Sequence, residues 1–240
     1  NNCQKNLESD DMIQIPNLFY KNVLEDKYSA IRFNMTVDLI KPYVKQTVKL
    51  LDIGCYTGDL LWALHQGINY YGVDTDEEAL KIAHERGAKV FKIDIENQIL
   101  PFNDQEFDIV VAAEILEPLR DPEKIMLQIK RIIKPEGIIL ISLPNECTIY
   151  HRIKVLLGKG IDGMGFAPHY HLHFPTLGQN VEFVGRYFEI IKKQYWVHLG
   201  SGKIEKILSK ISYKFWSGLA NLYPSLFARG VIYLCKLKKI

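Results

Sequence analysis

The stretch Val48–Asp59 constrains the fold of this chain more than any other part of its sequence. Val48–Ile53 is a short, nearly continuous apolar run, which is typical of a strand buried on both faces of a parallel sheet. Gly54 and Gly58 follow, and glycine lets the backbone turn sharply and approach a ligand. Leu60–Leu64 then has the composition of a helix. The stretch predicts a strand, a glycine loop and a helix, with free backbone N–H groups and a helix N-terminus facing a polar ligand.

The spacing of the glycines distinguishes between ligands. A dinucleotide site requires the pattern G-x-G-x-x-G, but Tyr56 stands at the position of its second glycine. The loop instead reads Asp52-x-Gly54-x-x-x-Gly58, and a carboxylate at Asp52 would repel a pyrophosphate but could help to hold an ammonium group. This pattern resembles the first motif of the class I S-adenosylmethionine-dependent methyltransferases. The resemblance implies S-adenosyl-L-methionine as the cofactor, with Asp52, Cys55 and the two glycines at its amino-acid portion.

Strand and helix signals alternate along the rest of the chain. Asp121 and Pro122, for example, introduce a helical stripe of isoleucines that ends at 134–137. The alternation predicts an α/β fold with a doubly wound, seven-stranded, mostly parallel sheet of the Rossmann-like methyltransferase type. The predicted strands are 48–53, 69–73, 89–93, 107–113, 138–143, 187–196 and 231–238.

Several polar residues follow these strands directly, and ligands of such sheets bind at the carboxyl ends of the strands. Asp74, with Thr75 beside it, follows the second strand, where it could cap the next helix or accept the ribose hydroxyls of a nucleoside, and we favour the ribose. Asp94 and Ile95 follow the third strand, and the resemblance implies that they contact the adenine, whereas Asp94 taken alone reads as a turn residue. Ala113 ends the fourth strand beside them.

The resemblance extends to E-x-L-E-x-L-R-D-P and K-P-x-G, which are familiar in the branch that methylates small molecules, quinones and sugars. That branch commonly has Glu-His where this chain has Glu117-Pro118, so a histidine often proposed to assist catalysis is missing there. Three other histidines follow the glycine-rich stretch 158–168. Alternating His169, His171 and His173 could bind a metal, but a zinc site needs three or four ligands, and no Cys, Asp or Glu lies nearby in sequence, so we expect none.

The segment H-L-x-F-x-T that begins at His171 also resembles a family motif that leads into the helix before the sixth strand. The resemblance implies His171 as the catalytic candidate, with His169 as the second choice. Thr176 and Gln179 form the capping box with which that helix should begin.

The two ends of the chain add helices to the core. The stretch 18–44 has the apolar period of an amphipathic helix, which either covers a sheet edge or also closes the cofactor pocket through Tyr20, Tyr28 or Arg32. An insertion at about 201–228 precedes the last strand, and from Lys203 it has lysines on one face and apolar residues on the other. Packing of the apolar face on the core is the favoured interpretation, and a weak membrane-surface contact through 203–228 is the alternative.

Composition excludes several classes of protein. The 30 basic and 28 acidic residues nearly cancel, so we expect no nucleic-acid partner. The four dispersed cysteines indicate no disulfide framework, no apolar run is long enough to span a bilayer, and the polar start is not a signal peptide, which together favour a cytoplasmic protein. We expect one domain over 1–240, with a cofactor-binding half at 48–143 and a substrate-side half at 144–240.

Methyl transfer to a small-molecule or a glycan- or lipid-linked acceptor is therefore the leading hypothesis, with O-methylation favoured over N-methylation. A catalytically silent S-adenosylmethionine-binding protein is the alternative that Pro118 encourages, and a nucleotide-dependent oxidoreductase is disfavoured by the interrupted glycine pattern. The sequence leaves the oligomeric state open.

Overall fold

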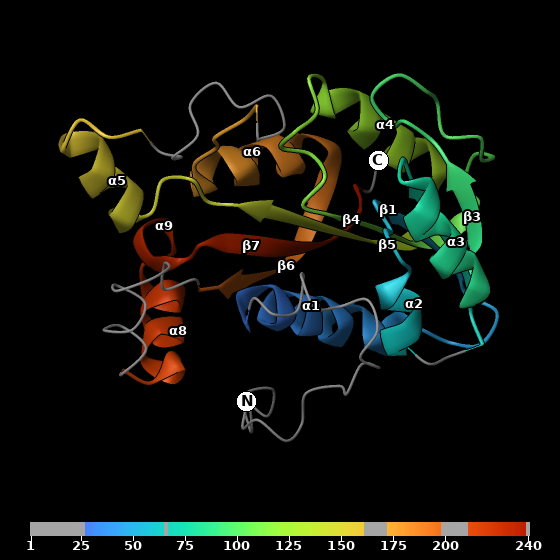
Figure 1. Cartoon of the computed structure of the whole chain (residues 1–240), viewed down its shortest axis with the longest axis horizontal. Helices are drawn as coiled ribbons and strands as arrows, with labels where there is room; N and C mark the ends of the chain where they lie inside the picture. Colours follow the sequence, from blue (N-terminus) through green and yellow to red (C-terminus); the bar gives the residue numbers. More distant parts are fainter. Residues whose placement is uncertain (1–26, 65–66, 161–171, 198–210, 239–240) are drawn as a thin grey trace.

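The structure is a computed structural model that describes residues 27–64, 67–160, 172–197 and 211–238 (Figure 1). Within these residues the chain forms one seven-stranded sheet in the order β3-β2-β1-β4-β5-β7-β6. The strands are β1 Lys49–Ile53, β2 Asn69–Asp74, β3 Lys89–Lys92, β4 Phe107–Ala113, β5 Ile133–Pro144, β6 Phe188–Trp196 and β7 Gly230–Leu237. The helices are α1 Lys27–Ile40, the 3-10 turn η1 Lys41–Tyr43, α2 Asp59–Leu64, α3 Glu77–Glu85, α4 Pro122–Ile132, α5 Ile149–Leu156, α6 Leu177–Tyr187, α8 Tyr213–Leu222 and α9 Pro224–Phe227.

The first five strands run parallel, as the alternating pattern predicts, and β1 pairs with β2 on one side and with β4 on the other. The chain therefore leaves β1 toward one edge of the sheet and returns at β4 on the other side of β1. Loops that follow β1 and β4 diverge at such a point and leave a crevice at the carboxyl ends of the strands. This crevice is where a ligand is expected.

Helices cover both faces of the sheet (Figure 1), which explains why its central strands are mostly apolar. Leu51 and Ile53 of β1 pack in one core with residues of α4 and α6. Leu50, the residue before Leu51, packs in the other core with residues of α1, α2 and α3. Alternate residues of a strand point to opposite faces, so a strand between two helical layers needs apolar residues at successive positions.

The far edge of the sheet reverses direction, because β7 is antiparallel to both of its neighbours, β5 and β6. β5 is also longer than predicted. The helix before it was expected to end at 134–137, but β5 already starts at Ile133. A register shift between Phe107 and Ile109 of β4 accommodates the extra residues as a bulge. The pairing of Phe107 with Ile133 explains why this stretch counts as strand.

Two helical segments differ from expectation. α1 is described from Lys27, so the part of the predicted helix before it lies outside the described residues. α5 was not predicted from the sequence. No helix in the described ranges is both long and apolar enough to cross a membrane.

Candidate functional site

The glycine loop after β1 forms a tight turn with a left-handed backbone. Gly54 has a φ of +79° and Gly58 a φ of +74°, a region that disfavours residues with a side chain. A Cβ on Gly54 would also lie 2.5 Å from Cγ2 of Ile115, in the loop after β4. Gly54 therefore serves both the turn and the close approach of the two loops that diverge at the crevice.

The N–H groups of this loop are not free, in contrast to the expectation from the sequence. Gly54 and Cys55 both donate to the carbonyl oxygen of Val73, at 2.8 and 3.1 Å. The N–H of Tyr56 donates to Oδ2 of Asp74 at 2.8 Å. The loop is thus bonded to the end of β2 and does not offer these donors to a pyrophosphate, which agrees with the exclusion of a dinucleotide made from the glycine spacing.

Asp52 places a buried carboxyl group below this turn. Its side chain is 7% exposed, and the hydroxyl group of Tyr70 donates to Oδ2 at 2.5 Å. Burial raises the pKa of Asp52 to about 6, the Tyr70 hydrogen bond opposes the shift, and the charge of Asp74 adds to it. A bound ammonium group would favour the ionised carboxylate, so the site fits the amino-acid portion of S-adenosylmethionine.

Asp74 is the last residue of β2 and joins the glycine loop to the start of α3. Its Oδ1 accepts from the N–H groups of Thr75 and Asp76 at 2.7 and 3.0 Å, and its Oδ2 accepts from Tyr56. Asp76, rather than Asp74, is the N-cap of α3. A carboxylate has about four acceptor sites, so the three backbone bonds leave about one for a ligand hydroxyl. The ribose contact itself stays a prediction.

Asp94 has the geometry of a turn residue. Its Oδ1 accepts from the N–H of Glu96 at 3.0 Å and its Oδ2 accepts from the side-chain amide of Asn97 at 2.7 Å, and these bonds, led by the one from Asn97, lower its pKa. Ile95 packs against the core beside it. Both residues lie at the carboxyl end of β3, where a contact with an adenine stays a prediction.

Glu114, directly after Ala113 at the end of β4, is a site residue that the sequence analysis missed. It has a φ of +56°, which is uncommon for a residue with a side chain and typical of sites under functional constraint. Its Oε1 accepts from the hydroxyl group of Ser142 at 2.6 Å, and its Oε2 lies 3.5 Å from the guanidinium group of Arg32. Of the α1 residues expected to close the pocket, Arg32 thus reaches the crevice, and its guanidinium also lies 6.0 Å from the ring centre of Trp196.

A pocket of about 450 Å³ opens between the loop after β4 and helix α6. Its wall at Leu116 and Glu117 continues directly from Ile115, which borders the glycine turn. The pocket is therefore adjacent to the crevice. Its lining residues are Leu116, Glu117, Pro122, Leu143, Leu172, His173, Phe174, Pro175, Gln179, Asn180, Glu182, Phe183 and Arg186.

Comparison with known proteins identifies the domain that holds this crevice. Residues 51–141 match the family model described as a methyltransferase domain, and these residues begin in β1 and end in β5. A ubiquinone biosynthesis O-methyltransferase of Rickettsia bellii is 28% identical over 149 residues, which cover 59% of this chain and 61% of that protein. The chain carries a class I S-adenosylmethionine-dependent methyltransferase domain. The domain implies S-adenosylmethionine as the cofactor, and the buried Asp52 and the close-packed Gly54 fit it.

Other proteins that are similar to this chain have names that describe different activities. The human mitochondrial arginine-hydroxylase NDUFAF5 is 29% identical over 122 residues, which cover 50% of this chain and 35% of that protein. The structure of an S-adenosylmethionine-dependent methyltransferase from Archaeoglobus fulgidus superposes with a TM-score of 0.57 and 22% identity, over 90% of this chain and 99% of that one. The chain spans less than two thirds of the length of the two curated relatives.

The catalytic histidines proposed for the methyltransferase, His169 and His171, lie outside the described residues. The structure does place the residues that follow them. The N–H groups of Leu172 and His173 both donate to the carbonyl oxygen of Glu117, at 2.9 and 3.2 Å. The ring of His173 is within hydrogen-bond distance, 2.8 Å, of the carbonyl oxygen of Leu119. The histidine segment therefore ends at the rim of the pocket.

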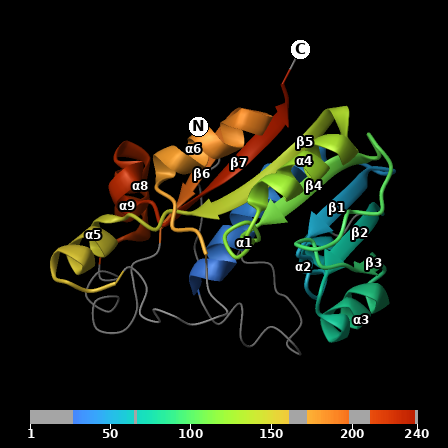
Figure 2. The ribbon, with the colours of Figure 1, turned by 90° about the horizontal axis from the view of Figure 1, so that it is seen from above.

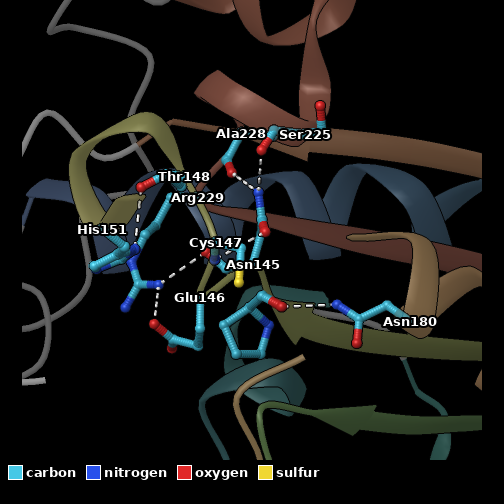
Figure 3. A network of polar contacts seen from close by, with 10 residues as sticks. Asn145, Glu146, Cys147, Thr148, His151, Asn180, Ser225, Ala228 and Arg229 are labelled. Carbon is cyan, nitrogen blue, oxygen red and sulfur yellow. Dashed lines mark hydrogen bonds and ion pairs between the residues drawn. The ribbon is translucent and has the colours of Figure 1, made fainter. Parts of the chain in front are cut away.

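A cluster of polar residues after β5 joins two segments of the chain that are distant in sequence (Figure 3). Asn145 is fully buried, and its side-chain amide donates to the carbonyl oxygens of Ser225 and Ala228 at 3.3 and 2.9 Å. Arg229 donates to Glu146 at 2.8 Å. These bonds tie the chain between β5 and α5 to the chain around α9, although the two are far apart in sequence.

Proposed function

We propose that this chain transfers the methyl group of S-adenosylmethionine to a small-molecule or a glycan- or lipid-linked acceptor, and that an acceptor oxygen is favoured over nitrogen. The observation that carries the proposal is the arrangement of Asp52, Asp74 and Glu114 at the carboxyl ends of three adjacent strands, around a glycine turn. When bound, the cofactor supplies an electrophilic methyl group, so the protein mainly has to align the acceptor and exclude water.

The pocket beside the crevice supports a small-molecule acceptor. Its apolar wall, including Leu143, Phe174 and Phe183, suits a ring or an alkyl chain, while Glu117 and Arg186 add charged groups that orient a polar acceptor. The name of the Rickettsia relative, which is an O-methyltransferase, supports oxygen as the acceptor atom.

A hydroxyl acceptor must lose a proton during transfer, and an imidazole suits this role near neutral pH. We assign the role to His171, with His169 as the alternative. The support is positional, because Leu172, the next residue, is bonded to Glu117 at the pocket, and the ring of His173 is placed against Leu119.

Calorimetric titration tests the cofactor site. S-adenosylmethionine and its demethylated product should bind, and Asp74→Ala should weaken binding by about 1 to 3 kcal/mol, because a ligand hydroxyl and the Tyr56 N–H would lose their acceptor. The exposed Glu85→Ala on α3 is the matched control and should bind as the wild type does. Tight binding of a nicotinamide dinucleotide, or unchanged binding by Asp74→Ala, would contradict the assignment.

Turnover with a panel of hydroxylated and amine acceptors tests the proton acceptor. His171→Gln should lower the rate of methyl transfer while leaving cofactor affinity nearly intact, since the change removes a base and not a cofactor contact. His84→Gln, an exposed histidine on α3, serves as the control. An equal loss of cofactor binding in His171→Gln would indicate a structural histidine. Cofactor binding without transfer to any acceptor would favour the catalytically silent binding protein.

A further inference from the structure

Helix α5 turns an apolar stripe toward solvent. Ile149, Ile153 and Leu156 recur at positions i, i+4 and i+7, and their side chains are 41%, 49% and 85% exposed. Tyr150 and Leu157 extend the stripe and are 46% and 68% exposed. A surface helix of a globular protein normally turns such a stripe toward the core. Here the stripe faces outward.

On the opposite side of α5, His151 is buried against the protein, while Val155 is 52% exposed. His151 is 8% exposed, and its Nδ1 lies 3.0 Å from the hydroxyl group of Thr148, the N-cap residue. Successive helical residues are about 100° apart, so Arg152 and Lys154 lie at opposite borders of the apolar stripe. Lys154 also lies 5.6 Å from the ring centre of Tyr150. Long cationic side chains beside an exposed apolar stripe are typical of a helix that lies in the interface of a membrane.

A second helix at the same end of the molecule repeats the pattern. Phe215 and Leu222 of α8 are seven residues apart and are 53% and 67% exposed, and Tyr223, which follows, is 53% exposed. The apolar face of this segment was expected to pack on the core, but in its described part the side that packs includes Ala220 and Trp216. Phe215 and Leu222 therefore lie outside the side of α8 that packs on the core.

Helix α5 and the α8–α9 segment are held in fixed positions relative to each other. Figures 1 and 2 both show α5, α8 and α9 at one end of the molecule. The buried Asn145, four residues before α5, donates to the carbonyl oxygens of Ser225 in α9 and of Ala228 after it (Figure 3). α5 and the α8–α9 segment are therefore anchored to one another by a buried cluster. The surface that these helices form at this end of the molecule is called the end surface.

The charge of this end surface indicates which kind of partner it can bind. Residues 147–160 and 211–228 contain four cationic residues and neither Asp nor Glu. The four cations are Arg152, Lys154, Lys159 and Lys214. A two-fold contact with a second copy of the chain would bring these like charges face to face, whereas anionic lipid headgroups would complement them. We propose that the end surface formed by α5 and α8–α9 docks on an anionic lipid bilayer. The proposal does not depend on the methyl acceptor.

Cosedimentation with vesicles tests the proposal. The chain should sediment with vesicles that contain phosphatidylglycerol, and much less with pure phosphatidylcholine vesicles, and added salt should weaken the binding because it screens the cations. The double variant Leu156→Glu with Leu157→Glu should lower the partition coefficient at least about tenfold, since it places charges in the stripe. Leu127→Glu changes a leucine of α4 that is 55% exposed on another helix and should bind vesicles as the wild type does.

Two further measurements keep the test decisive. The variant Lys154→Glu with Lys159→Glu leaves the apolar stripe intact and should also lose binding to anionic vesicles, so it decides the question if the leucine variant folds poorly. Hydrogen exchange in the presence of vesicles should slow within 149–157 and 213–223. Equal vesicle binding by wild type and both double variants would overturn the proposal. So would a wild-type dimer that the leucine variant dissociates in the absence of lipid.

Discussion

Ligand binding and folding stability place opposite demands on the carboxyl group of Asp52. The carboxyl group is buried, and among the described residues its one close donor is Tyr70, so the folded protein disfavours its ionised form. The ligand, in contrast, requires that form if its ammonium group is to bind there. The ammonium group of the cofactor would therefore be the charge partner that the described part of the chain does not supply to Asp52.

The pH dependence of stability should reveal this opposition. The pKa of Asp52 is about 6 in the folded chain against an ordinary value of 3.8, so its contribution to stability is fully present below about 4 and is lost as the pH rises through about 6. Asp52→Asn should thus unfold with nearly the wild-type free energy at pH 4 and be more stable by up to about 3 kcal/mol at pH 8. Urea denaturation across this range measures the difference.

The same variant should bind S-adenosylmethionine more weakly, because the ammonium group loses a charged partner. Asp38→Asn, at an exposed acid of α1, provides the control. If the stability difference between Asp52→Asn and the wild type does not change with pH, Asp52 is not buried as a titrating acid.

At the scale of elements, α5 and α6 contrast in how far their sequences define them. α6 begins with Thr176 and Gln179, whose reciprocal capping box was predicted and is present, with the Gln179 N–H donating to the Thr176 hydroxyl group at 3.2 Å and the Thr176 N–H donating to the Gln179 side chain at 2.9 Å. α5 begins at Thr148 without such a bond from its cap. Its position depends instead on the cluster around Asn145.

Replacing Asn145, which anchors α5, should therefore lower the free energy of unfolding much more than replacing an exposed asparagine would. Asn145→Ala would leave the buried carbonyl oxygen of Ala228 and the partly buried one of Ser225 without this donor, and should lower the free energy of unfolding by about 2 to 3 kcal/mol. Asn221→Ala removes an exposed asparagine whose side-chain amide donates to Ser217 within α8, and should cost less than about 0.5 kcal/mol. Thermal and urea denaturation compare the two. Similar costs for both variants would show that the buried cluster does not anchor α5.

At the scale of the whole molecule, the function depends on the order of the strands. β1 and β2 are consecutive in sequence and in the sheet, but β4 reaches the other side of β1 only through the crossover. This crossover brings Ile115 against Gly54, and Arg32 of α1 toward Glu114. The crevice, the adjacent pocket and the proposed lipid-facing end thus all lie where strands end or chain segments cross.

The sequence by itself determined the features that depend on neighbouring residues. The apolar runs predicted the strands, and the spacing of Gly54 and Gly58 predicted a turn that excludes a dinucleotide. Asp74, Asp94 and Ala113 were correctly placed at strand ends, because side-chain period and glycine geometry act over a few residues.

Only the tertiary structure decided the features that depend on contacts between distant segments. The loop N–H groups proved to be bonded because the carbonyl oxygen of Val73 and the carboxylate of Asp74 lie against the loop. Glu114 became a site residue through its contacts with Ser142 and Arg32. The outward stripe of α5 has the same sequence pattern as a core-facing helix, and whether another element covers such a stripe is set by packing, which no local pattern encodes.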